Sequence, residues 1–485
     1  MRFHPEASSR ASTAALDRSQ VPAIGADKSF VTPAVESARL ENGLEIFVVE
    51  RRELPKVAVT LATRAGTVAD PAGRAGLAHL TVATIDLGTK TKSALAIEAA
   101  LGDLGTSLTG SAARESTQLS FQVLGRNLAP AFSIFADVVR HPVFPESEIA
   151  REKKALLDRI TQDASNPSAL ASRVGDMLLF GPEHPYGRPR TGLAGTIEPV
   201  TRAEIAHFHE TWWKPAGSAL IFAGDISLEE ATKLAREHFG SWSGGAPPAV
   251  TIPAPQPVGP GRVFVVDRQD AAQTHVAQLL PGPPRSTEDY YALNLANSVW
   301  GGGFQSRLIA NLREDKGYSY GIYSFPSFHT KAGAWMATGG VQTDKTRESI
   351  VELNAELAAI AGGKPVTQAE LADAKASRVR GYAQEFRTMN QIVGQIAYLW
   401  TLGLPMTELQ RVTEETQRAD LATVNQAARK YAVPGKATLL LIGDYAKIAP
   451  GLRELDLGKI TVLDAEGKPV QATQLQSQNN APRGD

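Results

Sequence analysis

Short apolar runs and longer amphipathic stretches alternate along most of this chain. The runs are bounded by Gly, Pro or Asn, as buried strands usually are. They predict strands over residues 45–51, 57–63, 119–124 and 218–223. The stretches between them carry apolar residues at helical spacing. They predict helices over residues 76–89, 128–139 and 146–163, and a further helix that begins with the Thr-x-x-Glu capping box at Thr201.

The apolar pattern stops after Trp242. Residues 243–261 contain no charged side chain, and six prolines lie between Pro247 and Pro260. A Pro-rich, uncharged segment of this kind is typical of an extended, semi-rigid linker. We therefore expect the boundary between two halves of the chain to lie here.

Landmarks before the linker recur after it. The segment 263–268 (VFVVDR) repeats 46–51 (IFVVER) at an offset of 217, and 439–444 (LLLIGD) repeats 220–225 (LIFAGD) at an offset of 219. Nearly equal offsets at both ends of each half indicate an internal duplication. The predicted organisation is an N-terminal extension (1–35), a first half (36–242), the linker (243–261), a second half (262–465) and a polar tail (466–485).

Composition narrows the class of protein without identifying it. A chain of 485 residues, 43% hydrophobic and 21% charged, is expected to form a soluble globular protein of several domains. Its net charge of -1 offers no field that would attract nucleic acid or anionic lipid. It has no cysteine, which excludes disulfides and thiolate sites, and no apolar run long enough to span a membrane. The first 29 residues lack the apolar core of a secretory signal, so we expect a cytoplasmic protein, or a periplasmic one whose leader lay upstream.

The first candidate for chemistry is the segment 76–89, GLAHLTVATIDLGT. It resembles the zinc helix of the pitrilysin/insulinase family, in particular the branch with mitochondrial processing peptidase. That family frames an inverted zinc motif, H-x-x-E-H, with Gly-Leu-Ala before it and Leu-Gly-Thr after it. The two His, four residues apart, bind Zn²⁺ from one helix face, and the Glu takes a proton from the zinc-bound water.

In this chain the frame is present, but most of the zinc chemistry is missing. His79 keeps the first ligand position, whereas Val82 replaces the general base and Ala83 the second His. The third ligand of the family is a Glu about 75 residues further on, and the resemblance places Arg159 there. Asp158 is its neighbour, but one residue is about 100° around a helix, so it is not a substitute. We therefore expect no zinc and no other cofactor on this chain.

The remaining histidines of interest favour a structural interpretation. With no second ligand, His79 is expected to be a core or interface histidine of an apolar helix. His207 and His209 form an H-x-H pattern in the helix that follows Thr201. Residues two apart on a helix point to different faces, so a shared metal ion is not expected there.

The second candidate lies between Trp300 and Ser324. The chain reads GGG at 301–303, SRL at 306–308 and LREDKGYSY at 312–320. These motifs resemble the second half of the same family, where an Arg and a Tyr seven residues apart contact the substrate backbone and the Tyr helps to stabilise the oxyanion. Carried over by position, the resemblance gives these roles to Arg313 and Tyr320.

The residues of this segment are also consistent with a purely structural reading. Leu308 and Leu312 lie one turn apart and should pack inward, and Gly317 should cap the helix in a left-handed conformation. The Tyr-rich alternation that follows predicts a strand. An Arg in the last turn favours the helix dipole, and Tyr is common in strands. A phosphate cradle at the triple glycine is not favoured, because the Lys-Ser/Thr of a P-loop and an acidic ribose partner are both missing.

The resemblance implies an α+β fold of two duplicated halves, each an antiparallel-rich sheet backed by helices. It also implies a function: the non-zinc subunit of a heterodimeric zinc metallopeptidase that cleaves peptides. A homologous partner with an intact H-x-x-E-H would bind the Zn, and this chain would supply Arg313 and Tyr320. The alternative is a catalytically silent structural subunit, like the core proteins of respiratory complexes. An independent hydrolase is not favoured, because the sequence has no candidate triad.

Overall fold

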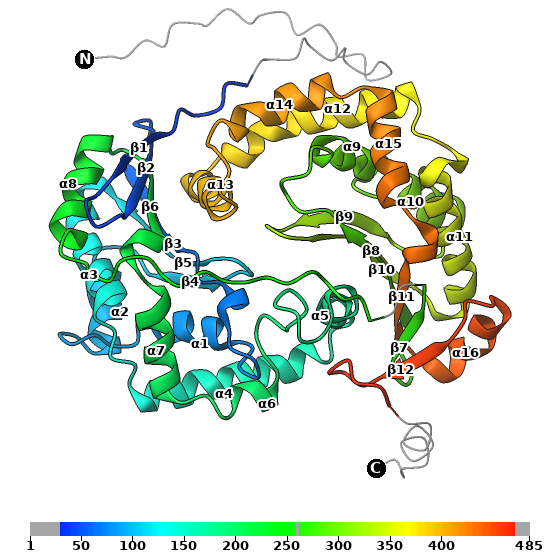
Figure 1. The fold of residues 1–485 in the computed structure, drawn as a ribbon, viewed down its shortest axis with the longest axis horizontal. Helices are drawn as coiled ribbons and strands as arrows, with labels where there is room; N and C mark the ends of the chain where they lie inside the picture. The colour runs from blue at the N-terminus through cyan, green and yellow to red at the C-terminus, as the bar shows by residue number, and fades with distance from the viewer. Residues whose placement is uncertain (1–29, 259–260, 471–485) are drawn as a thin grey trace, which may run out of the picture. The chain divides into compact units, whose positions relative to one another are not determined.

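Two six-stranded β-sheets form the centre of the part of the chain that the computed structural model describes, residues 30–258 and 261–470 (Figure 1). The strands of the first sheet are β1 (Glu36–Arg39), β2 (Glu45–Glu50), β3 (Lys56–Thr63), β4 (Thr109–Ala112), β5 (Thr117–Leu124) and β6 (Ser218–Gly224). Those of the second are β7 (Val263–Asp267), β8 (Gln273–Gly282), β9 (Tyr323–Phe328), β10 (Gly333–Gln342), β11 (Thr438–Gly443) and β12 (Ile460–Leu463). The described residues from Thr32 onward belong to one compact unit.

The two sheets repeat one topology. Their orders are β1-β2-β6-β3-β5-β4 and β12-β7-β11-β8-β10-β9. Read in sheet order, β2-β6-β3-β5-β4 of the first sheet corresponds strand for strand to β7-β11-β8-β10-β9 of the second. Most neighbours are antiparallel, and the parallel pairs are β2 with β6 and β7 with both β11 and β12. The expected α+β fold of two duplicated halves with antiparallel-rich sheets is confirmed.

Helices cover both sheets, and half of the sixteen α-helices in the described residues begin at a side-chain cap. The first half contains α1 (Leu77–Thr84), α2 (Ala94–Asp103), α3 (Leu128–Arg140), α4 (Glu146–Asp163), α5 (Pro167–Phe180), α6 (Ala194–Ile197), α7 (Arg202–Trp212) and α8 (Leu228–Phe239). The second contains α9 (Tyr290–Trp300), α10 (Arg307–Ile309), α11 (Thr346–Ala358), α12 (Gln368–Tyr382), α13 (Met389–Thr401), α14 (Glu408–Arg418), α15 (Leu421–Tyr431) and α16 (Tyr445–Glu454). The predicted capping box is confirmed, because Thr201 and Glu204 bond reciprocally at the start of α7.

Two predicted elements differ from the structure. The helix expected over 76–89 ends at Thr84, because the chain turns there toward Gly88, whose φ of 141° and bridge to Ser93 place it in a loop. The strand expected directly after Gly317 begins only at Tyr323, and Ser319 forms just an isolated bridge with Val341.

The predicted linker carries no helix or strand in its described residues, 243–258 and 261. Its main chain runs along the end of α5, where Gln256 N donates to Phe180 O (3.1 Å) and Val258 N to Leu178 O (2.9 Å). Residues 1–29 of the predicted extension and 471–485 of the predicted tail lie outside the described residues. No helix in the described part of the chain is long and apolar enough to cross a membrane.

Each sheet has one face that packs on helices of its own half. In the first sheet, Val59 and Phe222 meet Phe132 of α3 and Phe239 of α8 in one apolar core. In the second, α9, α11, α12 and α15 cover the corresponding face. These two cores hold the sheets to the helices that follow them in sequence.

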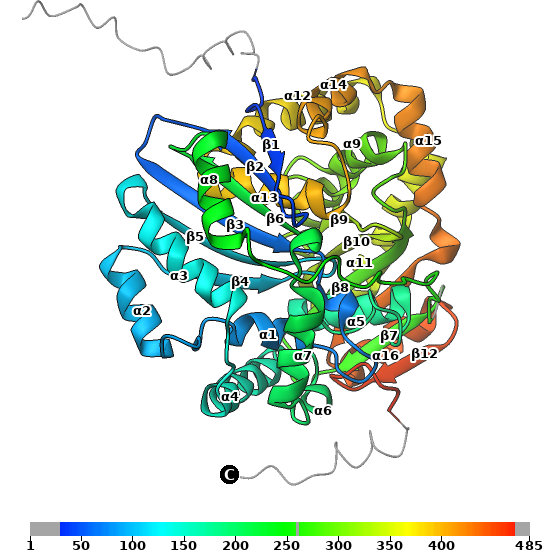
Figure 2. The ribbon, with the colours of Figure 1, turned by 60° about the vertical axis from the view of Figure 1, so that its left-hand side comes forward.

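The opposite faces are covered by an exchange of helices between the halves (Figures 1 and 2). Helix α5 comes from the first half but packs on β8 and β11 of the second sheet, and α13 comes from the second half but packs on β6 and β3 of the first. Paired alanines on the first sheet, such as Ala58 opposite Ala223, leave room for α13. Its Trp400 donates from Nε1 to Glu45 Oε1 (3.0 Å), and its carbonyl accepts from Arg64 (2.9 Å).

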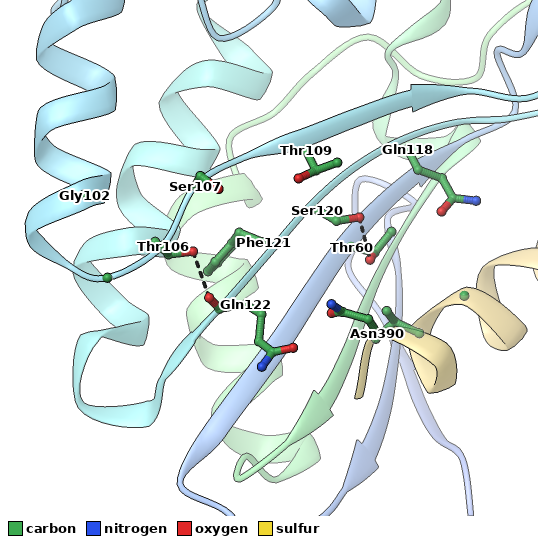
Figure 3. Close-up of a pocket in the computed structure, with 13 residues that line it drawn as sticks. Thr60, Gly102, Thr106, Ser107, Thr109, Gln118, Ser120, Phe121, Gln122 and Asn390 are labelled. Atoms are coloured by element: carbon green, nitrogen blue, oxygen red, sulfur yellow. Dashed lines mark hydrogen bonds between the residues drawn. The ribbon is translucent and has the colours of Figure 1, made fainter. Parts of the chain in front are cut away.

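Helix α13 does not reach the far side of the first sheet. On β5 the side chains alternate, with Leu119, Phe121 and Val123 in the core and Gln118, Ser120 and Gln122 on the uncovered face. The register places Thr60 of β3 and Thr109 of β4 beside Ser120 on that face. This part of the sheet and one end of α13 therefore enclose an open polar space, seen in Figure 3.

We predict that Trp400→Ala destabilises both halves together. The substitution removes a buried indole ring and its hydrogen bond to Glu45. It also removes the stacking of the Arg64 guanidinium, whose Cζ lies 4.3 Å from the centroid of that ring. The expected loss is about 3–5 kcal/mol in the free energy of unfolding, measured by denaturant titration. Val351→Ala, at an exposed site on α11, is the control and should cost less than about 0.5 kcal/mol. Equal effects of the two variants would contradict the role of the exchanged helix.

Candidate active site

Helix α1, which carries the first candidate segment, is fixed at its start by a buried carboxyl group. Asp70 accepts hydrogen bonds from Gly76 N (2.8 Å) and Ala78 N (2.7 Å). Burial raises the pKa of Asp70 to about 7, and the two N–H bonds oppose that rise. Gly76 has a φ of 93°, and a Cβ there would lie 2.8 Å from Thr191 O. Only glycine therefore allows the loop to pack this closely against the helix.

The zinc-motif positions of α1 face two different environments. His79 and Ala83 are half-buried on one side of the helix, whereas Val82 is 3% exposed. Val82 packs against β4, where a Cβ built on Gly110 would come within 2.7 Å of its Cγ2. The side chain in the general-base position thus serves the contact between helix and edge strand.

The third ligand position carries a cation. Arg159 is exposed on α4, which packs on α1. Burial lowers the pKa of His79, and the charges of Arg159 and Arg190 lower it further, so the imidazole is neutral at pH 7. An imidazole, two apolar side chains and a guanidinium do not match the donor set that Zn²⁺ requires. No group of three His, Asp or Glu within residues 30–258 and 261–470 could hold a metal ion.

His207 and His209 lie on opposite faces of α7, as the sequence predicts. His207 is exposed, whereas His209 is buried, and its Nε2 donates to Val139 O (2.9 Å). Burial lowers the pKa of His209 to about 4. The pair therefore shares no ligand, and His209 is a neutral structural donor.

The second candidate segment begins with a glycine loop that seals a sheet edge. Gly301 O accepts from Ser324 N of the edge strand β9 (2.8 Å), and a Cβ on Gly301 would come within 2.6 Å of Ser324 Oγ. Gly302 lies equally close to Asn297. The first two glycines thus let the end of α9 approach β9, which gives the triple glycine a packing role.

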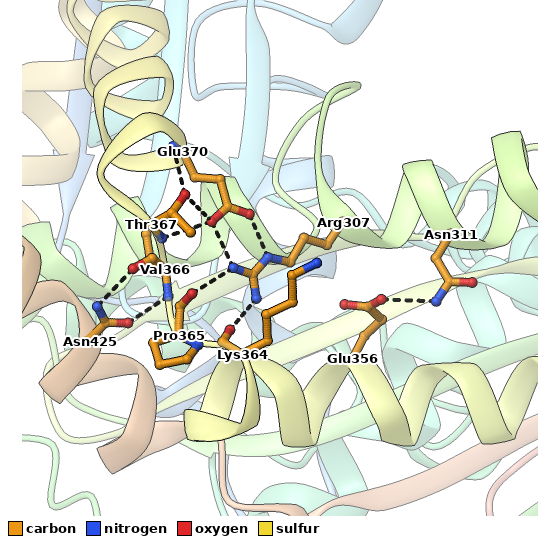
Figure 4. Close-up of polar contacts among 9 residues, drawn as sticks. All are labelled: Arg307, Asn311, Glu356, Lys364, Pro365, Val366, Thr367, Glu370 and Asn425. Carbon is orange, nitrogen blue, oxygen red and sulfur yellow. Dashed lines mark hydrogen bonds and ion pairs between the residues drawn. The ribbon is translucent and has the colours of Figure 1, made fainter.

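A buried arginine then fixes the helix that follows (Figure 4). Arg307 grips Glu370 with two hydrogen bonds (2.7 and 2.8 Å) and also donates to Lys364 O (2.6 Å) and Pro365 O (3.0 Å). These contacts hold α10 against the start of α12. The Arg307 guanidinium lowers the pKa of Glu370 to about 2.

Arg313 projects from the π-helical turn Ala310–Asp315, which continues α10. Leu308 and Leu312 are fully buried beneath it, as predicted. The Arg313 side chain is 38% exposed, lies 4.6 Å from the Phe304 ring centroid and pairs with Glu314 at 3.3 Å. Its position is thus set from below by the core and from the side by an aromatic ring.

Tyr320 follows on a turn that folds back over the same helix end. Gly317 has a φ of 63°, as its predicted capping role requires, and its N–H donates to Arg313 O (3.2 Å). Tyr318 N donates to Leu312 O (2.9 Å), which returns the chain to the start of this turn. Tyr320 itself is 86% exposed and makes no hydrogen bond to the residues that the structure describes. Arg313 and Tyr320 therefore lie on the two sides of one hydrogen-bonded helix end, and the Tyr320 side chain is exposed.

Sequence reasoning missed three residues that shape these sites. Arg307 was noted only as part of a motif, and Asp70 and Arg190 were not noted at all. The sequence did hold a signal for Arg307, because it directly precedes Leu308, which the pattern places in the core. An Arg so close to the core needs a hydrogen-bonding partner. Arg190 and Asp70 act across loops, and no local pattern marks them.

Comparison with known proteins supports the family resemblance. The family model for insulinase (peptidase family M16) matches residues 46–178, and that for the peptidase M16 inactive domain matches residues 199–378. An uncharacterized zinc protease of Mycobacterium tuberculosis (strain ATCC 25618 / H37Rv) is 30% identical over 305 residues, 62% of this chain and 69% of the relative. An uncharacterized zinc protease of Mycobacterium leprae is 28% identical over 399 residues, which are 80% of this chain and 86% of the relative.

Solved structures share the fold. A peptidase M16 inactive domain from Pseudomonas fluorescens has a TM-score of 0.79 and 27% identity, covering 85% of this chain and 98% of that one. A protease from Helicobacter pylori has a TM-score of 0.77 at 19% identity, covering 85% of this chain and 99% of that one. The second likeness concerns the fold alone.

The Arg307–Glu370 pair predicts a stability that depends on pH. The pKa of Glu370 is about 2 in the folded chain and about 4.3 in an unfolded one. The pair therefore makes its full contribution to the free energy of unfolding above about pH 4.3, and this contribution is lost as the pH falls toward 2. Glu370→Gln should cost about 1.5–3 kcal/mol at pH 7, and this difference should shrink with falling pH. Denaturant titrations between pH 3 and pH 7 would measure it. The exposed Glu414→Gln is the control, and a pH-independent difference for Glu370→Gln would contradict the pair's role.

Proposed function

The chain belongs to the insulinase family of peptidases, family M16, and we propose that it is the subunit without zinc in a two-chain zinc peptidase. In this proposal a homologous partner with an intact H-x-x-E-H carries the zinc and the general base. This chain contributes Arg313 and Tyr320 to the shared site, and the substrate is a peptide.

One contrast carries the proposal. Of the four zinc-motif positions only His79 keeps a metal donor, and Val82 is used for packing. At the second segment the Arg and Tyr of the family are kept, and both are accessible on a turn that the core and Arg307 hold in place. A scaffold that cleaves nothing has no need of an exposed phenol and an accessible guanidinium at these two positions.

The proposed task of the pair is to bind and polarise the scissile carbonyl. Stacking on Phe304 covers a face of the Arg313 guanidinium, and Nε pairs with Glu314, so the terminal N–H groups are the ones that can donate to a substrate carbonyl oxygen. The Tyr320 hydroxyl, free of internal bonds among the described residues, can donate to the oxygen on which negative charge develops. Zinc on the partner would supply the activated water that attacks the carbonyl carbon.

We predict that Arg313→Ala and Tyr320→Phe each lower turnover strongly in the reconstituted pair. A donor aimed at a developing oxyanion typically contributes about 10²–10³-fold to kcat. Turnover of a small unstructured peptide would be measured after mixing with a candidate partner that carries the zinc motif. Co-elution in size-exclusion chromatography should be unchanged, because both side chains are accessible.

Tyr318→Phe is the matched control, since it removes a phenol from the same turn, two residues away, and should leave turnover within about twofold. If Arg313→Ala and Tyr320→Phe both retain full turnover, the catalytic role of the pair is wrong. A mixture that assembles but never cleaves would favour the alternative of a silent structural subunit.

We also predict that the purified chain retains no zinc. Its four motif positions offer a single metal donor, the imidazole of His79, and one donor does not hold Zn²⁺ against dialysis. Elemental analysis should find zinc far below one atom per chain, and a chelator should leave the thermal midpoint unchanged. The variant with Ala83→His and Arg159→Glu supplies two further ligands and is the positive control. Stoichiometric zinc in the unmodified chain would overturn this part of the proposal.

A further inference from the structure

The open polar space on the first sheet is a cavity of about 700 Å³ that the proposed roles of Arg313 and Tyr320 do not use (Figure 3). Its floor is the uncovered face of β4 and β5 together with Thr60 of β3, and one wall is the N-terminal part of α13. The side chains that offer hydrogen bonds across it include Thr60, Thr109, Gln118, Ser120, Gln122 and Asn390.

The lining of this cavity is polar but carries no charge. None of its thirteen residues is an Asp, Glu, Lys, Arg or His. The cavity therefore has no ionised group with which to bind a phosphate, a carboxylate or an ammonium group. Phe121 is its only aromatic residue and is 4% exposed, so the cavity offers no free ring on which a base or a sugar could stack.

Three carboxamides in the lining have no hydrogen-bond partner among the described residues. The Thr60 and Ser120 hydroxyls bond to each other (2.9 Å), and Thr106 Oγ1 donates to Gln122 O (2.8 Å). By contrast, the side-chain amides of Gln118, Gln122 and Asn390 make no hydrogen bond to any residue within 30–258 and 261–470. Two of them lie on one strand at a spacing of four residues, and the third faces them from α13 (Figure 3).

A carboxamide places an acceptor and a donor side by side, in the arrangement that the N–H and C=O of one residue present along an edge of an extended chain. Carboxamides four residues apart on a strand are about 13 Å apart along it, which is twice the repeat of about 6.6 Å at which an extended chain presents successive residues to the same edge. We propose that this cavity holds an extended polypeptide by its main chain, with little regard for its sequence. The ligand class is thus that of the proposed function, a peptide substrate, and the inference rests on that function to this extent.

Main-chain capture at this place would complement the catalytic pair. Arg313 and Tyr320 lie on the second half, whereas the cavity is built on the first sheet and the exchanged helix. A peptide held in the cavity is retained whatever its side chains, and its cleavage remains the task of the pair and the partner. Binding can therefore be tested without any partner present.

The test is fluorescence polarisation of the full chain with a labelled unstructured peptide. Gln118→Leu, Gln122→Leu and Asn390→Leu each remove one carboxamide and should weaken binding by about two- to tenfold, the range for one lost hydrogen-bonding group. Gln410→Leu, an exposed carboxamide on α14 outside the cavity, is the matched control and should leave the Kd unchanged. Thermal midpoints of all four variants check that folding is intact.

Changes to the peptide separate main-chain from side-chain recognition. Methylation of alternate backbone nitrogens should weaken binding at least as much as a variant does, because each methyl group removes a donor. A peptide of the same composition with shuffled sequence should bind within about twofold. The Kd should also be nearly independent of salt, since the cavity contributes no ionised group.

Full affinity for the methylated peptide, strong selection against the shuffled one, or a Kd weaker than about 1 mM would overturn the inference. These results differ from a failure of the proposed function. If the cavity binds peptides as described but Arg313→Ala and Tyr320→Phe retain full turnover, only the catalytic assignment is wrong. If the pair is needed for turnover but the carboxamide variants bind normally, only the cavity assignment is wrong.

Discussion

The exchange of α5 and α13 is the contact on which the rest of the structure depends. Each sheet has two apolar or partly apolar faces, and each half supplies helices for only one of them. Neither half can therefore bury its sheet alone, and the two must fold against each other. The same exchange shapes the polar cavity, because α13 covers β6 and β3 but leaves β5 and β4 open. It also explains the small side chains where the helix lies, such as Ala58 and Ala223.

The two candidate sites show how one duplicated scaffold has been used in two ways. In the first half, the helix that resembles a zinc helix is tied to its surroundings by Asp70 at one end and by Val82 against β4. In the second half, a buried arginine and a sealed sheet edge hold a turn whose polar side chains remain accessible. Buried contacts anchor the segment in both places, but only the second exposes the Arg and Tyr that the resemblance assigns to substrate binding.

Much of this architecture could be predicted from the sequence, because the determining interactions are local. Strands β2, β3, β5 and β6, the capping box at Thr201, the buried leucines around Arg313 and the left-handed Gly317 all follow from short-range patterns. The predicted end of the first helix was wrong because Gly88 lies in a loop that is closed by a bridge to Ser93 and held by a hydrogen bond from the distant Val143 N. The exchange of helices could not be predicted, since an amphipathic helix shows that it has an apolar face but not which sheet that face will meet. The same holds for Arg307, whose partners lie 57 to 63 residues away.

The exchange also has a consequence for synthesis of the protein. All strands of the first sheet have been synthesised once residue 224 is made, but the helix that covers one face ends at residue 401. At translation rates of about 5–20 residues per second, that face stays bare for on the order of ten seconds or more. Its alanines and its hydroxyl and carboxamide side chains make it a less adhesive surface than a face of large aliphatic residues would be. The composition that suits the finished protein thus also protects the nascent one while it waits for its missing helix.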